Sequence, residues 1–202
     1  MKKIFLEIII KLLILVLLIT DRLFKLLSYN KFLTAIHDKI EEKQYYKLLI
    51  NNKLVEFFCP STLTILRINS FFKKEPETLN WIDNFKNNNN EKIVFWDIGA
   101  NIGLYSIYAA TKYSNIEIIA FEPSTSNLRT LSRNISLNNL ENKIKIFPLA
   151  LSDKENFFSI FSETKFTEGS AMSNFDTKID QTGNIIDKNK IKNKYNLFGT
   201  NI

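Results

Sequence analysis

The alternation of apolar runs and amphipathic segments between residues 93 and 151 constrains the fold more than any other feature. Residues 93–96 are a continuous apolar run, which is typical of a buried parallel strand, and residues 116–121 and 144–151 are predicted as a second and a third strand. Between them, residues 104–112 and 124–137 repeat apolar positions at helical spacing, and Ser124 is a good N-cap for the second helix. This β-α-β-α-β order predicts an α/β fold with a parallel, doubly wound sheet and right-handed crossovers.

The flanking sequence predicts further elements and a division into three parts. A strand is expected at residues 53–58, helices at 62–72 and 77–85, and one more strand at 156–161. Residues 87–90 are a run of asparagine that reads as a linker, and residues 164–202 are polar without strong periodicity. We therefore expect an N-terminal helix at residues 1–28, a helical and short-strand extension at 29–90, and an incomplete Rossmann-like domain at 91–202.

Residues 1–28 are the most apolar part of the chain and allow three interpretations. No small-residue cleavage site follows them, which argues against a secretory signal. The charged residues Lys3, Glu7, Lys11, Arg22 and Lys25 fall near one stripe of a helix and leave the remaining circumference apolar. A helix that lies in a membrane interface, or that docks on protein, fits this stripe better than a membrane span does. We expect a cytoplasmic protein with peripheral membrane contact at the inner face through these residues.

The charge and composition of the chain argue against several classes of function. The chain has 202 residues and a formal net charge of +6, but only four of its 27 basic residues are arginine, and they are spread along the chain. This pattern argues against nucleic-acid binding, which favours clustered basic residues and arginine. Cys59 and His37 are the only residues of their kinds, so we expect no disulfide framework, no metal site and no histidine-based catalytic triad.

The ends of the predicted strands carry the candidate site. Asp97, Glu122 and the pair Ser152–Asp153 each follow a strand, so in a parallel sheet they meet at one crevice. The first loop places Asp97 two positions before Gly99, with Asn101 where a dinucleotide site needs a glycine.

A carboxylate is a poor neighbour for a diphosphate but suits a ligand with an amino group. Glu122, at the end of the next strand, can accept both hydroxyls of a ribose. A ribose and a cationic amine without a diphosphate describe S-adenosylmethionine; a purely structural loop is the alternative.

The same stretches resemble the FkbM family of S-adenosylmethionine-dependent methyltransferases. The resemblance rests on "FWDIGANIGLYSIYAA", "IIAFEPSTSNLRTLSRNISLNNL" and "IFPLALSD", in the order and spacing of the family, and it covers about residues 55–175. It implies a class I methyltransferase fold with S-adenosylmethionine as the cofactor. The implied cofactor-binding residues are the methionine-side loop of Asp97, Gly99, Ala100, Asn101 and Gly103, then Glu122 with Pro123 at the ribose, and Ala150, Ser152 and Asp153 near the adenine.

The resemblance also implies a class of reaction, to which there are two alternatives. Members of the family act mostly as O-methyltransferases, which implies a hydroxyl of a sugar, glycolipid or secondary metabolite as the acceptor. Similar proteins continue into further strands where this chain ends at Ile202, so we expect either a fragment or a degenerate half-domain. An inactive binding module and an oxidoreductase that binds NAD or a nucleotide sugar are the alternatives, and the sequence nominates no catalytic residue.

Overall fold

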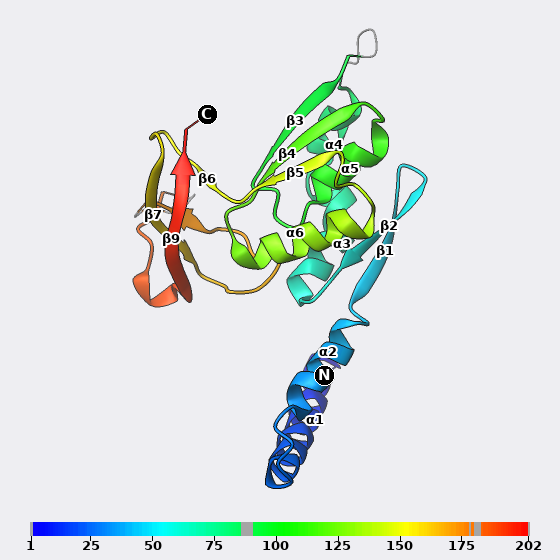
Figure 1. Ribbon diagram of the computed structural model, residues 1–202, viewed down its shortest axis with the longest axis vertical. Coiled ribbons are helices and arrows are strands. Elements are labelled where there is room, and N and C mark those ends of the chain that lie inside the picture. The colour runs from blue at the N-terminus through cyan, green and yellow to red at the C-terminus, as the bar shows by residue number, and fades with distance from the viewer. Residues whose placement is uncertain (1, 86–90, 178, 180–182, 202) are drawn as a thin grey trace. The chain divides into compact units, whose positions relative to one another are not determined.

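The computed structural model describes residues 2–85, 91–177, 179 and 183–201. The chain divides into two compact units, Met1–Gln44 and Tyr45–Ile202, which are described separately (Figure 1). Residues 29–44 therefore fall in the first unit and residues 45–85 in the second. The linker predicted at residues 87–90 lies outside the described residues.

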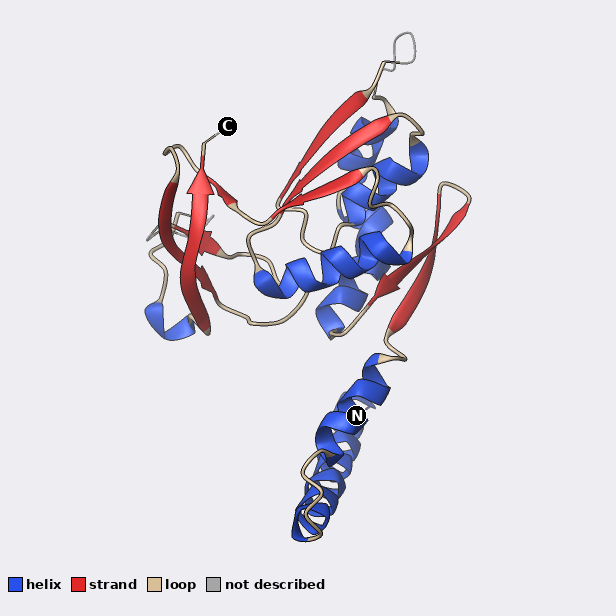
Figure 2. Ribbon diagram, viewed as in Figure 1, coloured by secondary structure: helices blue, strands red, loops and turns tan. Residues whose placement is uncertain are grey.

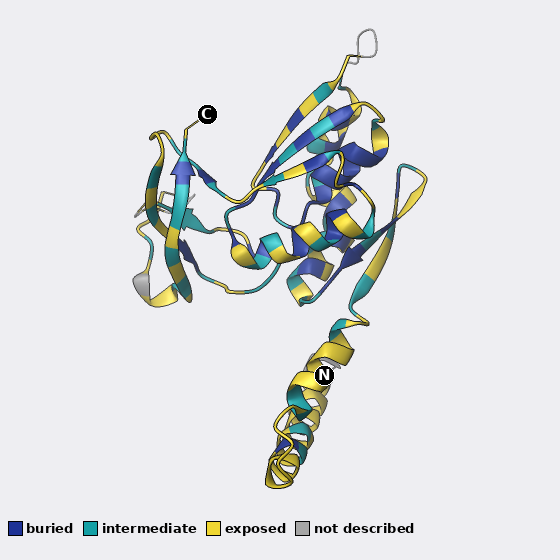
Figure 3. Ribbon diagram, in the orientation of Figure 1, coloured by how far each residue is buried: buried dark blue, intermediate teal, exposed yellow. Residues whose placement is uncertain are grey.

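The first unit consists of two helices, α1 (Lys2–Leu26) and α2 (Phe32–Glu41). The ring of Phe24 stacks on Phe32 at 4.8 Å between centroids, which joins the end of α1 to the start of α2. The Lys25 Nζ atom forms an ion pair of 2.7 Å with Asp21, one turn earlier in the same helix. Most large apolar side chains of α1 are exposed (Figure 3). Among the described residues, no helix is long and apolar enough to cross a membrane.

The second unit is built around a parallel sheet, as the alternating sequence predicts. Strands β3 (Ile93–Ile98), β4 (Ile116–Phe121) and β5 (Ile144–Phe147) lie side by side in the order β3-β4-β5 (Figure 2). Helices α5 (Leu104–Lys112) and α6 (Thr125–Leu137) connect them. The predicted cap is confirmed, because the Ser124 Oγ atom accepts a hydrogen bond from the Asn127 amide. The α/β, Rossmann-like class expected from the sequence is therefore confirmed.

The connecting helices α5 and α6 cover one face of this sheet (Figure 1). Alternate residues of β3 are buried against the helical layer, whereas Val94, Trp96 and Ile98 on the opposite face are 60, 42 and 61% exposed. Strand β3 is also an edge of the sheet as described, since its pairing partner is β4 alone. The continuous apolar sequence of residues 93–96 predicts burial on both faces, and this prediction is wrong for the described residues, because one face of β3 is buried and the other is exposed.

Residues 45–85 pack on the helical layer. Strands β1 (Tyr45–Ile50) and β2 (Lys53–Phe58) form an antiparallel hairpin, followed by helices α3 (Thr62–Lys74) and α4 (Pro76–Asp83). The buried Asn134 of α6 accepts a hydrogen bond from the Phe58 amide at 2.8 Å and donates one to the Ile102 carbonyl at 2.9 Å. One amide side chain thus fastens the hairpin and the β3–α5 loop to α6.

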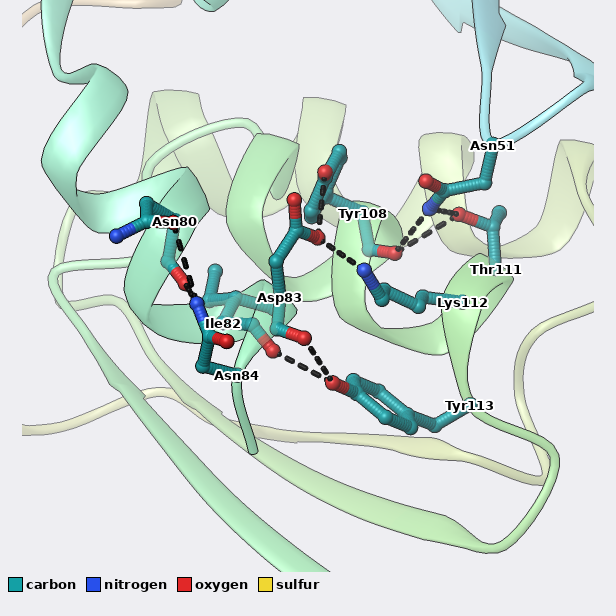
Figure 4. Close-up of polar contacts among 9 residues, drawn as sticks. All are labelled: Asn51, Asn80, Ile82, Asp83, Asn84, Tyr108, Thr111, Lys112 and Tyr113. Atoms are coloured by element: carbon teal, nitrogen blue, oxygen red, sulfur yellow. Dashed lines mark hydrogen bonds and ion pairs between the residues drawn. The ribbon is translucent and has the colours of Figure 1, made fainter. Parts of the chain in front are cut away.

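A polar cluster joins the end of α4 to α5 (Figure 4). The Asp83 carboxylate accepts a hydrogen bond from the Tyr108 hydroxyl at 2.8 Å and forms an ion pair of 2.5 Å with Lys112. The Tyr113 hydroxyl donates to the Ile82 carbonyl at 2.7 Å. Although burial opposes ionisation, Lys112 and Tyr108 hold the pKa of Asp83 below its ordinary value. The cluster therefore fastens the C-terminal turn of α4 to α5.

The C-terminal part forms a second, mixed sheet in the order β6-β9-β7-β8. Its strands are β6 (Ala150–Leu151), β7 (Phe157–Glu163), β8 (Asn174–Phe175) and β9 (Asn193–Thr200), with the short 3₁₀ helix η2 (Lys188–Lys190) before β9. The single strand predicted at residues 144–151 is wrong. Pro148 has no amide proton for a sheet ladder, so β5 ends there and β6 joins the second sheet instead, beside β9.

Candidate functional site

The β3–α5 loop turns sharply through three residues with positive φ. The φ angles are +77° at Gly99, +54° at Asn101 and +88° at Gly103. Glycine adopts this region freely, and asparagine tolerates it better than most other residues. The amides of Gly99 and Ala100 both donate to the Phe121 carbonyl at 2.9 Å, so the loop is fastened to the end of β4.

The carboxylate of Asp97 lies beneath this loop. Asp97 is 7% exposed, and its Oδ2 atom accepts hydrogen bonds from the Ser106 amide at 3.0 Å and the Ser106 hydroxyl at 2.5 Å. Burial raises the pKa of the Asp97 carboxyl above its ordinary value, although both bonds favour the ionised form. Asp97 therefore holds the first turn of α5 against β3.

The carboxylate of Glu122 joins the loop to the start of α6. Glu122 is 4% exposed; its Oε2 atom accepts from the Asn101 amide at 2.7 Å, and its Oε1 atom accepts from the Ser124 amide at 2.9 Å and the Asn127 side chain at 3.3 Å. Burial raises the pKa of Glu122, and the nearby charge of Asp97 adds to the rise. The two predicted carboxylates thus lie close enough to interact electrostatically.

A pocket of about 380 Å³ opens where the two sheets meet. Its walls come from the carboxyl ends of β3 and β4, from β6, and from β7 and β8 of the second sheet. The lining is mostly apolar and includes Gly99, Phe121, Pro123, Ala150, Phe161 and Phe175. A Cβ atom added to Gly99 would meet no described atom within 4 Å, so the pocket is open beside the loop.

The residues predicted from the sequence fall into three groups. Gly99, Pro123 and Ala150 line the pocket. Asp97, Ala100, Asn101, Gly103 and Glu122 belong to the hydrogen-bonded loop and strand ends described above. Ser152 and Asp153 follow β6, where the Ser152 amide donates to the Thr200 carbonyl at 2.9 Å and Asp153 is exposed.

One segment of the site has no signal in the sequence. Residues 168–170, in the polar stretch between β7 and β8, contact both α3 and α6. The Asn127 side chain accepts from the Gly169 amide at 2.8 Å and donates to the Ser170 carbonyl at 3.1 Å. Arg67 Nε donates to the Gly169 carbonyl at 2.5 Å and Asn101 Nδ2 to the Ser170 carbonyl at 2.6 Å. Arg67 and Gly169 are 102 residues apart, so no local pattern could have linked them.

Part of the chain is similar to two methyltransferases. A stretch of 56 residues, 28% of the chain, is 45% identical to the protein named methyltransferase sdnD of Sordaria araneosa. A stretch of 44 residues is 41% identical to the protein named Methyltransferase 1 of Beauveria bassiana. These matches cover 22% and 18% of the two proteins, so the chain spans less than a quarter of the length of either relative. No family model matches the chain.

The solved structures give a weaker likeness. The SAM-dependent methyltransferase from Agrobacterium tumefaciens aligns with 52% of the chain and 32% of its own, at 16% identity and a TM-score of 0.40.

Cys59 is buried, and burial raises the pKa of its thiol to about 11, so it is protonated at neutral pH. The His37 side chain is 72% exposed. Within the described ranges, no three histidine, cysteine, aspartate or glutamate residues are grouped closely enough to hold a metal ion.

Proposed function

We propose that this chain is the cofactor-binding part of an S-adenosylmethionine-dependent methyltransferase. The observation that carries the proposal is the pocket between the two sheets, which Gly99, Pro123 and Ala150 line. Gly99 and Pro123 follow β3 and β4 at the carboxyl ends where parallel α/β folds bind nucleosides, and Ala150 lies at the start of β6. The local identity to two proteins named as methyltransferases agrees with this assignment.

The residues present fit a nucleoside that carries an amino acid. The aromatic and proline side chains of the pocket, Phe121, Phe161 and Pro123, offer apolar surfaces for an adenine ring. The Glu122 carboxylate accepts hydrogen bonds from backbone amides and has the acceptor chemistry that ribose hydroxyls require. The bound cofactor would supply an activated methyl group, and the protein would align an acceptor and exclude water.

The acceptor class is a further part of the proposal. The resemblance of residues 55–175 to the FkbM family supports a hydroxyl of a sugar, a glycolipid or a secondary metabolite as the acceptor. We nominate no general base, because the tyrosine nearest the loop, Tyr105, already donates its proton to Glu75 at 2.7 Å, and burial raises its pKa further.

Isothermal titration tests the cofactor assignment. The chain is titrated with S-adenosylmethionine, S-adenosylhomocysteine and NAD. We expect binding of the first two with micromolar dissociation constants, on the order of −8 kcal/mol, and no binding of NAD. Binding of NAD alone would favour an oxidoreductase, and binding of none of the three would leave the pocket without the proposed ligand.

We also propose that α1 lies on an anionic membrane surface at the cytoplasmic face. Its apolar side chains are exposed over most of the circumference, and the exposed cations Lys11, Arg22 and Lys25 share one stripe of the helix. Apolar burial combined with attraction to anionic lipids is the binding mode of such helices.

Co-sedimentation with vesicles tests this placement of α1. We expect the protein to pellet with vesicles that contain about one third anionic lipid and to stay in solution with neutral ones. Val16→Glu, opposite the charged stripe, is expected to abolish pelleting, because a buried carboxylate costs several kcal/mol, on the order of 2–4. Glu7→Gln, on the charged stripe, is the matched control and keeps binding. Pelleting that is unchanged in Val16→Glu would contradict the placement.

A further inference from the structure

The segment of residues 168–170 brings a cation and an amide together beside the β3–α5 loop. Its two consecutive carbonyl groups, those of Gly169 and Ser170, accept hydrogen bonds from Arg67 and Asn101 respectively. The two side chains are thus both bonded to neighbouring residues of one segment, whose successive Cα atoms are about 3.8 Å apart. Helix α3 thereby reaches the loop that follows β3.

The position of this segment is fixed by close packing. Gly169 has a φ of +79°, and a Cβ atom there would lie 2.9 Å from the amide nitrogen of Thr64. The Ser61 hydroxyl donates to the Glu168 carbonyl at 2.7 Å, and Asn127 holds the backbone on the other side. Arg67 and Asn101 are therefore anchored on a rigid support rather than on a loose loop.

The guanidinium of Arg67 keeps unused donors. Its Nε atom is bonded to Gly169, but within the part of the chain that the structure describes, the two terminal nitrogens make no hydrogen bond and no ion pair within 4 Å. The side chain is partly buried, and Glu75 and Glu122 contribute negative potential to it without direct contact. Paired terminal nitrogens with a fixed Nε are arranged to bind a carboxylate in a bidentate manner.

Asn101 supplies the complementary acceptor. Its Nδ2 atom is bonded to Ser170, whereas its Oδ1 atom is buried and has no hydrogen-bond partner among the described residues. A buried amide oxygen without a donor costs about 1–3 kcal/mol, so it is an expected position for a ligand donor. The two side chains thus offer free donors for a carboxylate and a free acceptor for an ammonium group.

We propose that Arg67 and Asn101 bind the amino-acid end of the cofactor, with Arg67 at the α-carboxylate and Asn101 at the α-ammonium group. This inference rests on the proposed function and extends the site to α3, which the glycine loop and Glu122 do not include. The pocket beside Gly99 would hold the nucleoside, and Arg67 and Asn101 would hold the amino-acid end. Recognition of the two ends of the cofactor is then divided between different side chains.

Two ligands that differ only in the amino-acid end test the division. Isothermal titration compares S-adenosylhomocysteine with 5′-methylthioadenosine, which has the nucleoside and the thioether but no amino acid. Arg67→Met is expected to weaken S-adenosylhomocysteine about 10- to 100-fold, because a bidentate carboxylate contact is lost, and to leave 5′-methylthioadenosine unchanged. Lys73→Met, an exposed position on the same helix, is the matched control and changes neither affinity.

A second variant, at Asn101, tests the inference even if Arg67→Met does not fold. Asn101→Gly retains the positive φ of this position and removes Oδ1, and it is expected to produce the same selective loss. If each variant weakened the two ligands to the same extent, the inference would be overturned. It would also be overturned if neither variant weakened either ligand. In both cases the cofactor assignment would stay in place. A wild-type chain that binds neither ligand would instead overturn the proposed function, and this inference with it.

Discussion

Gly103→Ala is expected to lower the free energy of unfolding by about 2–5 kcal/mol, which is a large share of the stability of a domain of this size. The new Cβ atom would lie 2.6 Å from Leu131 Cδ1 and 3.7 Å from Ile107 Cδ1. Leu131 is fully buried in α6 and has little room to move. The φ of +88° adds the cost of a left-handed backbone for any residue with a Cβ atom. Urea denaturation followed by circular dichroism measures the loss.

Gly99→Ala separates the packing cost from the backbone cost. Its φ of +77° resembles that of Gly103, but no described atom lies within 4 Å of its added Cβ. We therefore expect a loss of only about 1–2 kcal/mol, which is the backbone cost alone. Equal losses at the two positions would contradict the close packing of Gly103 against Leu131.

Glu122→Gln is expected to weaken the binding of S-adenosylhomocysteine by at least about tenfold. Both carboxylate oxygens of Glu122 accept backbone amides, so the amide group of glutamine would place a donor against a donor. The loop at Asn101 and the start of α6 would then separate, and the acceptor offered to the ribose would be weakened. Isothermal titration of wild type and variant at one pH measures the change.

The same carboxylate gives a pH dependence with a defined sign. Burial raises the pKa of Glu122, so the ionised fraction falls as the pH is lowered toward that raised value. Wild-type affinity is therefore expected to fall as the pH is lowered over an interval that starts at neutral pH, and the affinity of Glu122→Gln to change less over this interval.

Glu117→Gln is the matched control for both measurements. Glu117 lies near the start of the same strand, paired with Lys92 and Lys145. A wild-type affinity that is constant over the pH interval, or a Glu117 variant that behaves like the Glu122 variant, would contradict the assigned role of Glu122.

The elements that the sequence predicts well are those whose signals are local. Helix α5 and strand β4 have the predicted bounds because their apolar periodicity is uninterrupted and polar residues flank them. Strand β2 was predicted correctly for the same reason. The cap at Ser124 could be predicted because the capping residue and the amide that it accepts are three positions apart.

The features that the sequence does not predict depend on distant partners. Strand β9 alternates only weakly, and its place is fixed by pairing with β7, whose paired residues lie 30 to 42 positions earlier in the chain. The break at Pro148 separates two apolar stretches that look like one strand, and their separation depends on β9 as the partner of β6. Asn127, Ser170 and Arg67 are ordinary polar residues in sequence, and hydrogen bonds between remote segments give them their positions in the site.

The arrangement of the pocket between two sheets implies an order of assembly. The β3-β4-β5 sheet closes through short crossovers, whereas pairing of β6 with β9 must close a loop from Ala150 to Gly199. Non-local pairings of this kind carry a larger entropy cost and form more slowly. The first sheet can therefore fold while the pocket does not yet exist, and the second sheet completes its far wall. If the pocket binds a nucleoside as proposed, the ligand would contact both sheets and would slow their separation more than it slows the unfolding of either sheet alone.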